Sequence, residues 1–215
     1  MAILANIKEA VIKGKTKEIG ALVQTALDEG AEPQDIINNY LIEAMKEVGA
    51  RFEAGNIFVP EMMIAARTMQ NGLAVIEPLI AAKEFKLEKL GTVVVGSVFG
   101  DLHDIGKNLV VLMLDSSGFN VIDIGVNVPV QTFVEKAKEL GADVVGISSL
   151  LTTGDPNMKA TVAAFKNSDL SEKVKIICGG AAVTEKHVFE QWEADGYAKD
   201  AASAVRVIKK LLGLD

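Results

Sequence analysis

The sequence is short of the residues that form cross-links or bind metals. Its 215 residues include one cysteine, Cys178, and two histidines. A single cysteine excludes an internal disulfide framework. A bare zinc ion needs three or four protein ligands, and no second histidine or cysteine is spaced to complete a site around either histidine. A metal in this protein would therefore have to bring most of its own ligands.

Excess basic charge and long apolar runs are also missing. Lysine and arginine number 22 against 29 acidic residues, a net charge of -7, which disfavours nucleic acid as a partner. No apolar run reaches the ~18 residues expected of a membrane span. The first residues, 1–8, lack the basic region of a signal peptide. We therefore expect a cytoplasmic protein that does not associate with membranes.

The N-terminal part has helical periodicity and almost no strand signal. Apolar spacing predicts helices over residues 3–12 and 19–27, a third from Pro33 to about Phe52, and a fourth from Pro60, which Pro78 would kink or end. Short connections between four helices predict a small bundle. The charged stretch 83–90 fits a linker.

Beyond residue 90 the period changes. Strand-like runs lie at 92–98, 120–126, 143–148 and 174–178, with a short fifth near Tyr197. Helical segments lie between them near 105–117, 130–140, 156–167 and 184–193, with a last one at 200–212. This alternation predicts a parallel, doubly wound sheet. The fold class is therefore α/β: an N-terminal four-helix bundle over 1–87 and a flavodoxin-like (Rossmann-like), five-stranded parallel α/β domain over 88–215.

The stretch 100–108, Gly-Asp-Leu-His-Asp-Ile-Gly-Lys-Asn, follows the first buried strand and opens a helix. Ligands of open α/β sheets bind at the carboxyl ends of the strands, where this loop lies. Asp101 stands two positions before His103, so their side chains converge if the loop curls. A neutral imidazole is a common metal ligand, and a carboxylate typically holds its second nitrogen. Gly106 leaves space beside them.

Two other strand ends suit a large ligand. Residues 146–154 end one strand with small and hydroxyl side chains, and Gly179 and Gly180 end the next, where they let a ligand approach the backbone. Each of these segments could alone be an ordinary turn. Together with a single histidine they favour a macrocycle that supplies most of the metal's ligands.

The combination Asp101-x-His103-x-x-Gly106, Ser148-x-Leu150 and Gly179-Gly180 resembles the cobalamin-binding signature. Residues 58–67 are similar to the last cap helix of methyl-transferring corrinoid proteins. The resemblance covers nearly the whole chain. It extends to the corrinoid proteins of methanol, methylamine, betaine and aryl methyl ether methyltransferase systems, and to the cobalamin module of methionine synthase.

The resemblance implies a role for each matching residue. His103 would replace the benzimidazole of cobalamin as the lower ligand of cobalt, and Asp101 would hydrogen-bond His103. Gly106 would let the displaced nucleotide tail pass, and Thr152 could hydrogen-bond the cofactor. The tail's channel would be lined by Ser148, Leu150, Gly179 and Gly180. Family members often carry a hydroxyl residue where this chain has Gly154, which leaves a proton relay through a third side chain in question.

The resemblance also implies a function. A corrinoid protein of this kind accepts a methyl group as Co(I) becomes methyl-Co(III), at a substrate-specific methyltransferase. It passes the group to a second methyltransferase acting on a folate or thiol, and a reductive activator protein restores Co(I). The chain itself needs no catalytic acid or base for this role. Two alternatives are the cobalamin-binding subunit of a mutase, which usually lacks a helical cap, and a cobalamin-dependent sensor, which usually carries a DNA-binding segment.

The remaining candidate residues have less specific interpretations. We interpret Cys178 as a small packing residue, His187 as a surface helix residue and Trp192 as packing for the last helices. Met62, Met63 and Met69 fit the bundle core better than a cofactor cover. A mobile lid over the cofactor would use Phe58, Val59, Met62 and Met63, with 83–90 as its hinge.

Overall fold

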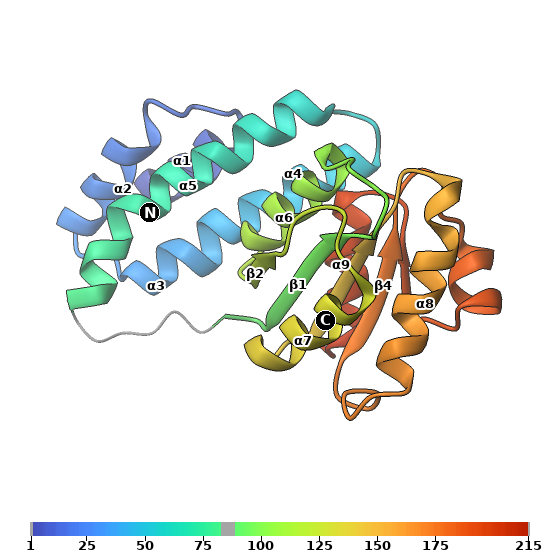
Figure 1. Cartoon of the computed structure of the whole chain (residues 1–215). Helices are drawn as coiled ribbons and strands as arrows, with labels where there is room; N and C mark the ends of the chain where they lie inside the picture. Colours follow the sequence, from blue (N-terminus) through green and yellow to red (C-terminus); the bar gives the residue numbers. More distant parts are fainter. Residues whose placement is uncertain (1, 83–88, 215) are drawn as a thin grey trace. The chain divides into compact units, whose positions relative to one another are not determined.

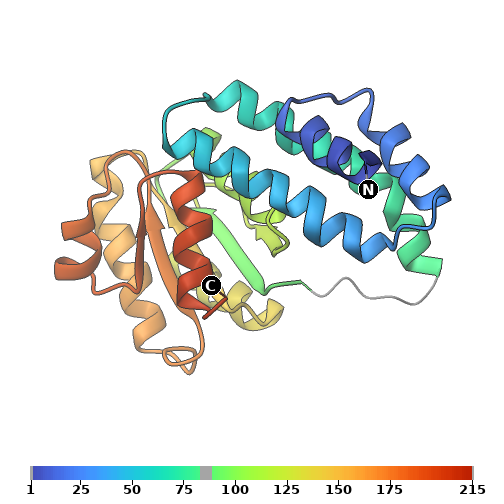
Figure 2. The ribbon, with the colours of Figure 1, turned by 180° about the vertical axis from the view of Figure 1, so that it is seen from behind.

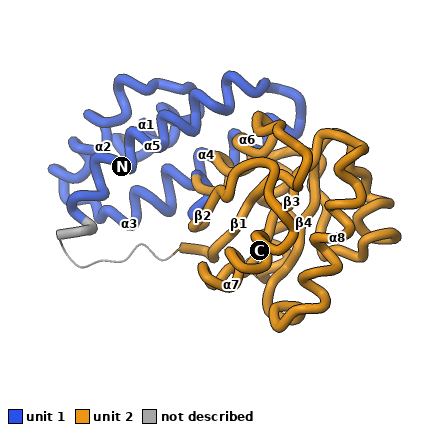
Figure 3. Tube along the Cα trace, viewed as in Figure 1, with its two compact units in different colours: residues 1–88, 116–118 blue, residues 89–115, 119–215 orange. Residues whose placement is uncertain are grey.

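The computed structural model of the chain describes residues 2–82 and 89–214. It divides into two compact units, residues 1–88 with 116–118 and residues 89–115 with 119–215 (Figure 3). The predicted boundary between residues 87 and 88 and most of the predicted linker 83–90 lie outside the described residues. The domain limits therefore stay a prediction, and each unit is described by itself.

The first unit is helical, as predicted. Its elements are α1 (Ala2–Ile12), α2 (Ile19–Asp28), α3 (Pro33–Asp35), η1 (Ile36–Ile42), α4 (Glu43–Glu53) and α5 (Val59–Ala82). Elements α3, η1 and α4 follow one another without a break, so the third predicted helix is one continuous helical segment. Its middle is π-helical, with wider turns that a 3.6-residue pattern does not reveal. Pro78 does not end α5, which continues to Ala82.

The core of the helical unit follows the predicted apolar stripes. Met62 and Met69 are fully buried, whereas Met63 is exposed, so two of the three methionines belong to the core. Phe58 is also exposed. Of the residues assigned to a lid, Met62 is therefore not available at the surface, and the lid itself stays a prediction. The fully buried side chains of this unit include Ile7, Ile19, Ile36, Leu41, Met45 and Ile76.

The second unit contains a five-stranded parallel sheet in the order β2-β1-β3-β4-β5. The strands are β1 (Thr92–Ser97), β2 (Asn120–Asp123), β3 (Val144–Ser148), β4 (Lys175–Gly179) and β5 (Gly196–Ala198). This is the flavodoxin-like order, and the strand order reverses between β1 and β3. The crevice at this reversal is where folds of this type bind ligands. The fold class predicted from the sequence is confirmed.

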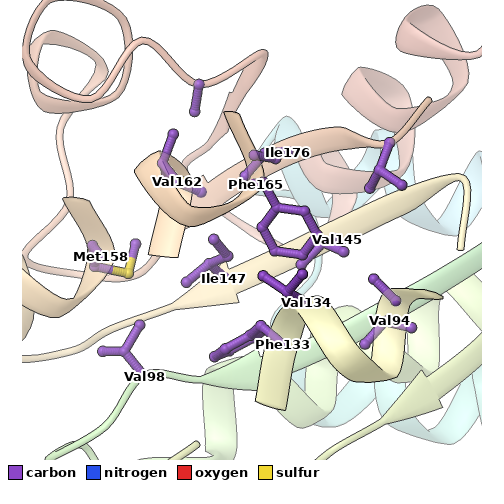
Figure 4. Packing of buried hydrophobic residues seen from close by; sticks show 14 of the residues in the cluster. Val94, Val98, Phe133, Val134, Val145, Ile147, Met158, Val162, Phe165 and Ile176 are labelled. Atoms are coloured by element: carbon purple, nitrogen blue, oxygen red, sulfur yellow. The ribbon is translucent and has the colours of Figure 1, made fainter. Parts of the chain in front are cut away.

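Helices cover both faces of the sheet (Figures 1 and 2). Helices α6 (Ile105–Asp115) and α9 (Ala201–Leu211) pack against each other on one face, and α7 (Val130–Leu140) and α8 (Asp155–Lys166) pack on the other. Figure 4 shows the core beneath α7 and α8, where Phe133 and Phe165 meet the strand residues Val145 and Ile147. Helix α9 begins with a capping box in which Asp200 and Ser203 satisfy each other's backbone N–H groups.

The helix predicted over 184–193 is shorter than expected, by one residue at its start and two at its end. Only residues 185–191 are helical, and most of them form the π-helical turn η3 (His187–Gln191). Because the helix ends at Gln191, Trp192 turns back so that its ring stacks on that of His187, with centroids 5.6 Å apart. His187 is consequently half-buried and not a surface helix residue, which corrects the sequence interpretation.

Candidate functional site

The carboxyl ends of the central strands are in register. Ser97 of β1 pairs with Ser148 of β3, and Ser148 pairs with Gly179 of β4. The loops that follow these strands therefore start at the same level of the sheet. The backbone N–H of Ser149 continues the ladder by donating to the carbonyl of Gly179 at 3.1 Å. The motif loop and two other candidate segments thus meet at one edge, as the sequence predicted.

The loop after β1, residues 98–104, is held by hydrogen bonds from several elements. The Ser97 hydroxyl donates to the carbonyl of His103 at 2.9 Å. The Asn127 side-chain oxygen accepts from the N–H of Gly100 at 2.8 Å, and the backbone N–H of Asn127 donates to the carbonyl of Asp101 at 2.9 Å. Asn157 donates to the carbonyl of Phe99 at 2.9 Å. These contacts fix the loop before any ligand binds.

Asp101 and His103 converge as predicted. The Oδ1 atom of Asp101 accepts from the N–H of His103 at 2.9 Å and lies 2.8 Å from its Nδ1 atom. An ionised carboxylate only accepts, so Nδ1 is the donor in this contact, and in the neutral imidazole this tautomer leaves the lone pair on Nε2. No described residue forms a hydrogen bond with Nε2, and half of the His103 side chain, 51%, is exposed. The imidazole is therefore oriented by Asp101 and free to ligate a metal.

The second oxygen of Asp101 is bound to the loop after β3. Oδ2 accepts from the Ser149 hydroxyl at 2.9 Å and from the N–H of Leu150 at 2.7 Å. Asp101 is 1% exposed. Burial opposes ionisation of this carboxyl, but the hydrogen bonds from His103, Leu150 and Ser149 outweigh it and lower the pKa of Asp101 to about 2. The carboxylate is thus charged at neutral pH and joins two strand ends.

Ser149 is the site residue that the sequence analysis missed. It sits next to Ser148, which carried the motif, and neighbouring residues at a strand end point to opposite sides. A Cβ atom on Gly154 would lie 2.2 Å from the Ser149 hydroxyl, so glycine at position 154 leaves the space that Ser149 occupies. The hydroxyl that donates to Asp101 therefore comes from Ser149. Glycine is needed at position 154 because a side chain there would clash with Ser149.

Comparisons with known proteins agree with this geometry. Sequence models described as B12 binding domains match residues 91–206 and 3–77. The chain is 42% identical over 210 residues to the dimethylamine corrinoid protein of Methanosarcina barkeri, covering 98% of this chain and 97% of that one. This chain belongs to the B12-binding corrinoid proteins.

Solved structures support the same family. The structure of the methanol:cobalamin methyltransferase complex MtaBC from Methanosarcina barkeri matches with a TM-score of 0.85 at 27% identity, over 99% of this chain and 80% of that chain. A cobalamin-binding protein from Desulfitobacterium hafniense matches with a TM-score of 0.80 at 30% identity, over 97% and 98% of the two chains. Cobalamin is accordingly the cofactor of this corrinoid protein.

The residues at the sheet edge fit such a cofactor. The His103 imidazole is oriented and accessible, and exposed apolar side chains lie on the loops after β1 and β3 and at the first position of α6. We name these side chains the apolar rim: Phe99, Leu102, Ile105, Leu150 and Leu151. Apolar surface that a monomer leaves exposed is typical of a ligand site. No group of three His, Cys, Asp or Glu side chains among the described residues is placed to hold a bare ion, so the metal must arrive within its macrocycle.

The predicted tail residues lie at the strand ends, in different surroundings. A Cβ atom on Gly106, the second residue of α6, would meet nothing within 4 Å, so this glycine leaves open space. Gly180 has a φ of +123°, and a Cβ there would lie 2.0 Å from the Ser149 carbonyl oxygen. Glycine at position 180 thus lets the backbone after β4 lie close to the backbone after β3. A bulky residue at Gly180 would therefore disturb the sheet itself.

The other residues predicted to contact the cofactor lie in two kinds of place. Thr152 lines a cavity beside the sheet, whereas Ser148, Leu150 and Gly179 are not among the residues that line this cavity. Their role toward the cofactor stays a prediction.

Cys178 is fully buried as a free thiol, as expected of a packing residue, and burial raises its pKa well above the ordinary value. Within the described residues, no helix combines the length and apolar character of a membrane span.

Proposed function

We propose that this corrinoid protein carries a methyl group from a substrate-specific methyltransferase to a second methyltransferase that acts on a folate or thiol. When bound, cobalamin supplies the cobalt that takes up and gives up the methyl group. The observation that carries the proposal is the Asp101–His103 pair, an oriented imidazole at the switch point of the sheet. The relative that is a dimethylamine corrinoid protein favours a methylamine as the donor, and the matching methanol:cobalamin complex supports a methyltransferase partner.

The residues of this chain have distinct tasks in the proposal. His103 would hold cobalt through Nε2, while Asp101 would fix the ring by accepting a hydrogen bond from Nδ1. The apolar rim would offer the macrocycle apolar contacts and would help to exclude water from the cofactor. Gly106 leaves passage for the nucleotide tail. Because reduced cobalt is readily oxidised, the proposal includes a reductive activator protein as a third partner.

The function is tested by methyl transfer from dimethylamine. The full chain, loaded with cobalamin and chemically reduced, is incubated with a dimethylamine-specific methyltransferase and dimethylamine. We expect close to one methylamine released per protein-bound cobalamin, and none without the chain. Free cobalamin at the same concentration is the control. If dimethylamine, trimethylamine, monomethylamine and methanol, each with its own methyltransferase, all give no transfer, the carrier proposal is wrong.

The ligand role of His103 is tested on the same preparation. Paramagnetic-resonance spectra of the Co(II) form should show splitting from a protein nitrogen, which changes when the histidines carry ¹⁵N. His103→Ala should abolish that splitting while Asp104→Asn, an exposed neighbour on the same loop, should keep it. A His103→Ala spectrum identical to wild type would exclude His103 as the ligand.

Gly106 allows a clean test of the tail's passage. Its Cβ position is open and it lies in the first turn of α6, so Gly106→Leu should fold normally. We expect occupancy by cobalamin to fall at least tenfold, while cobinamide, which lacks the nucleotide, binds as in wild type. Gly106→Ala is the matched control and should bind both. Equal loss of both corrinoids in a folded Gly106→Leu would contradict the role of Gly106 in tail passage.

A further inference from the structure

Asn127 lies in the connection between β2 and α7, in a backbone conformation that favours glycine. Its φ is +54°, and among the described residues Glu193 is the only other non-glycine residue with a positive φ. Asparagine tolerates this left-handed region better than most residues, but the conformation still has a cost. Backbone strain of this kind persists only where the surrounding structure holds it, and it gathers at functional sites. The contacts that Asn127 makes are therefore candidates for a functional role.

Asn127 forms two hydrogen bonds with the loop that carries the proposed cobalt ligand. Its side-chain oxygen accepts from the N–H of Gly100 at 2.8 Å, and its backbone N–H donates to the carbonyl of Asp101 at 2.9 Å. Gly100 has a φ of +84°, so the loop turns sharply where these two bonds hold it. One residue thus fixes both the first N–H and the last carbonyl of the dipeptide formed by Gly100 and Asp101.

The backbone of Asn127 is anchored on the end of β1. Before it, the carbonyl of Gly125 accepts from the N–H of Ser97 at 3.0 Å. After it, the N–H of Val128 donates to the carbonyl of Ser97 at 3.0 Å, and Val128 is buried. The end of β1 therefore sets the position of Asn127, and the two bonds of Asn127 carry that position to the loop.

Asp101 connects Asn127 with the metal ligand. The backbone carbonyl of Asp101 is held by Asn127, while its carboxylate lies 2.8 Å from Nδ1 of His103. The same carboxylate accepts from the Ser149 hydroxyl at 2.9 Å, so it meets both partners only if its own backbone is correctly placed. We infer that Asn127 is a positioning residue for the cobalt ligand and acts through Asp101. This inference rests on the proposed ligation of cobalt by His103.

Loss of the side-chain acceptor should loosen the loop and weaken ligation. Without the Asn127 oxygen, the N–H of Gly100 is left to water, and Asp101 keeps only its backbone bond to residue 127. A hydrogen bond of this kind changes an equilibrium that depends on it by about two- to tenfold. We therefore expect the equilibrium constant for ligation of Co(II) by His103 to fall by about two- to tenfold.

The Co(II)/Co(I) midpoint potential of the cobalamin-loaded chain reports this equilibrium constant. Co(I) holds no axial ligand, so weaker ligation of the Co(II) form makes reduction easier and raises the potential. At about 59 mV per tenfold for a one-electron couple, the expected rise is about 20–60 mV. The exchange rate of the Gly100 amide in the full chain without cofactor is a second readout, and it should increase by about two- to tenfold.

Three variants separate the hydrogen bond from the backbone conformation. Asn127→Gly removes the acceptor and adopts the positive φ without strain, so it should fold and raise the potential. Asn127→Asp keeps an acceptor, so its potential should lie at or below that of the wild type, because the added negative charge opposes reduction. Glu193→Gly is the matched control. It also relieves a positive φ, of +55°, but its side chain pairs with Lys166, so the potential should stay at the wild-type value.

The effect of Asn127 on the potential is expected to depend on His103. In a His103→Ala background, Asn127→Gly should leave the potential unchanged, because the ligation on which it acts is already lost. A rise of equal size in that background, or in Glu193→Gly, would overturn the inference. A folded Asn127→Gly with the wild-type potential, or with the wild-type exchange rate at Gly100, would overturn it as well.

The failure of this inference and that of the proposed ligation give different results. If His103→Ala raises the potential and abolishes the nitrogen splitting while Asn127→Gly changes neither, the ligation stands and only the role of Asn127 is wrong. If His103→Ala itself keeps the potential and the nitrogen splitting of the wild type, the proposed ligation is wrong and the inference fails with it.

Discussion

Replacing Asp101 by asparagine is expected to lower the free energy of unfolding at pH 7 by about 2–4 kcal/mol. Oδ1 of Asp101 accepts from the N–H of His103, and Oδ2 accepts from the N–H of Leu150 and the Ser149 hydroxyl. An amide places its NH₂ group on one of these two sides. Either way it faces a backbone N–H that cannot turn round and become an acceptor. Asparagine, although similar in size, therefore leaves a buried donor unpaired.

The pH dependence of the free energy of unfolding should also show the stabilising effect of the Asp101 carboxylate. The pKa of Asp101 is about 2 in the folded chain against an ordinary value of 3.8. Because the folded state depresses the pKa, the charged carboxylate stabilises the protein fully above about pH 4, and this contribution disappears as the pH falls toward 2. The shift corresponds to about 2 kcal/mol. Denaturant unfolding should show this loss in the wild type and not in Asp101→Asn.

Asp104→Asn is the matched control for both measurements. Asp104 lies on the same loop and is exposed, and among the described residues its side chain accepts only from Asn108, at 3.2 Å. Its replacement should change the free energy of unfolding by less than ~0.5 kcal/mol. Equal stability of Asp101→Asn and Asp104→Asn at pH 7 would show that the Asp101 network contributes nothing to the fold.

The fold was predictable because its signals are local. Runs of β-branched residues such as 92–98 are short and buried on both faces, and the segments between them have helical spacing. The two π-helical segments were not predictable, since widening a turn leaves the apolar stripe nearly unchanged. At η3 this mattered, because a helix ending at Gln191 and not at residue 193 places His187 against Trp192.

The site was predictable where the contacts lie within one loop. Asp101 and His103 are two residues apart, and their hydrogen bond confirms the predicted convergence. Ser149 is 48 residues from Asp101, and its orientation depends on how β3 ends, which no local pattern specifies. Nδ1 of His187 and Nε1 of Trp192 are buried without a hydrogen-bond partner in the described part of the chain, which no sequence pattern could predict, because an absent partner is a property of the folded structure.

Exchanging the residues at positions 149 and 154 should show that each determines the other. Gly154→Ser alone is expected to lower the free energy of unfolding by about 1–3 kcal/mol, because its Cβ would lie 2.2 Å from the Ser149 hydroxyl and 3.3 Å from Val98 Cγ2. Ser149→Gly alone removes a donor from Oδ2 of Asp101 and should raise the pKa of that carboxyl. The double variant Ser149→Gly/Gly154→Ser removes the clash and restores a hydroxyl near Asp101, now from position 154.

Four proteins complete the cycle: the wild type, the two single variants and the double variant. We expect the double variant to be about 1–3 kcal/mol more stable than the sum of the single effects predicts. An NMR titration of the Asp101 carboxyl gives an independent readout, with the pKa raised in Ser149→Gly and returned toward about 2 in the double variant. Gly106→Ser controls for the substitution itself, since its Cβ position is open. Additive stabilities, with the Asp101 pKa equal in Ser149→Gly and the wild type, would mean that Ser149 is a neighbour of the carboxylate and not its partner.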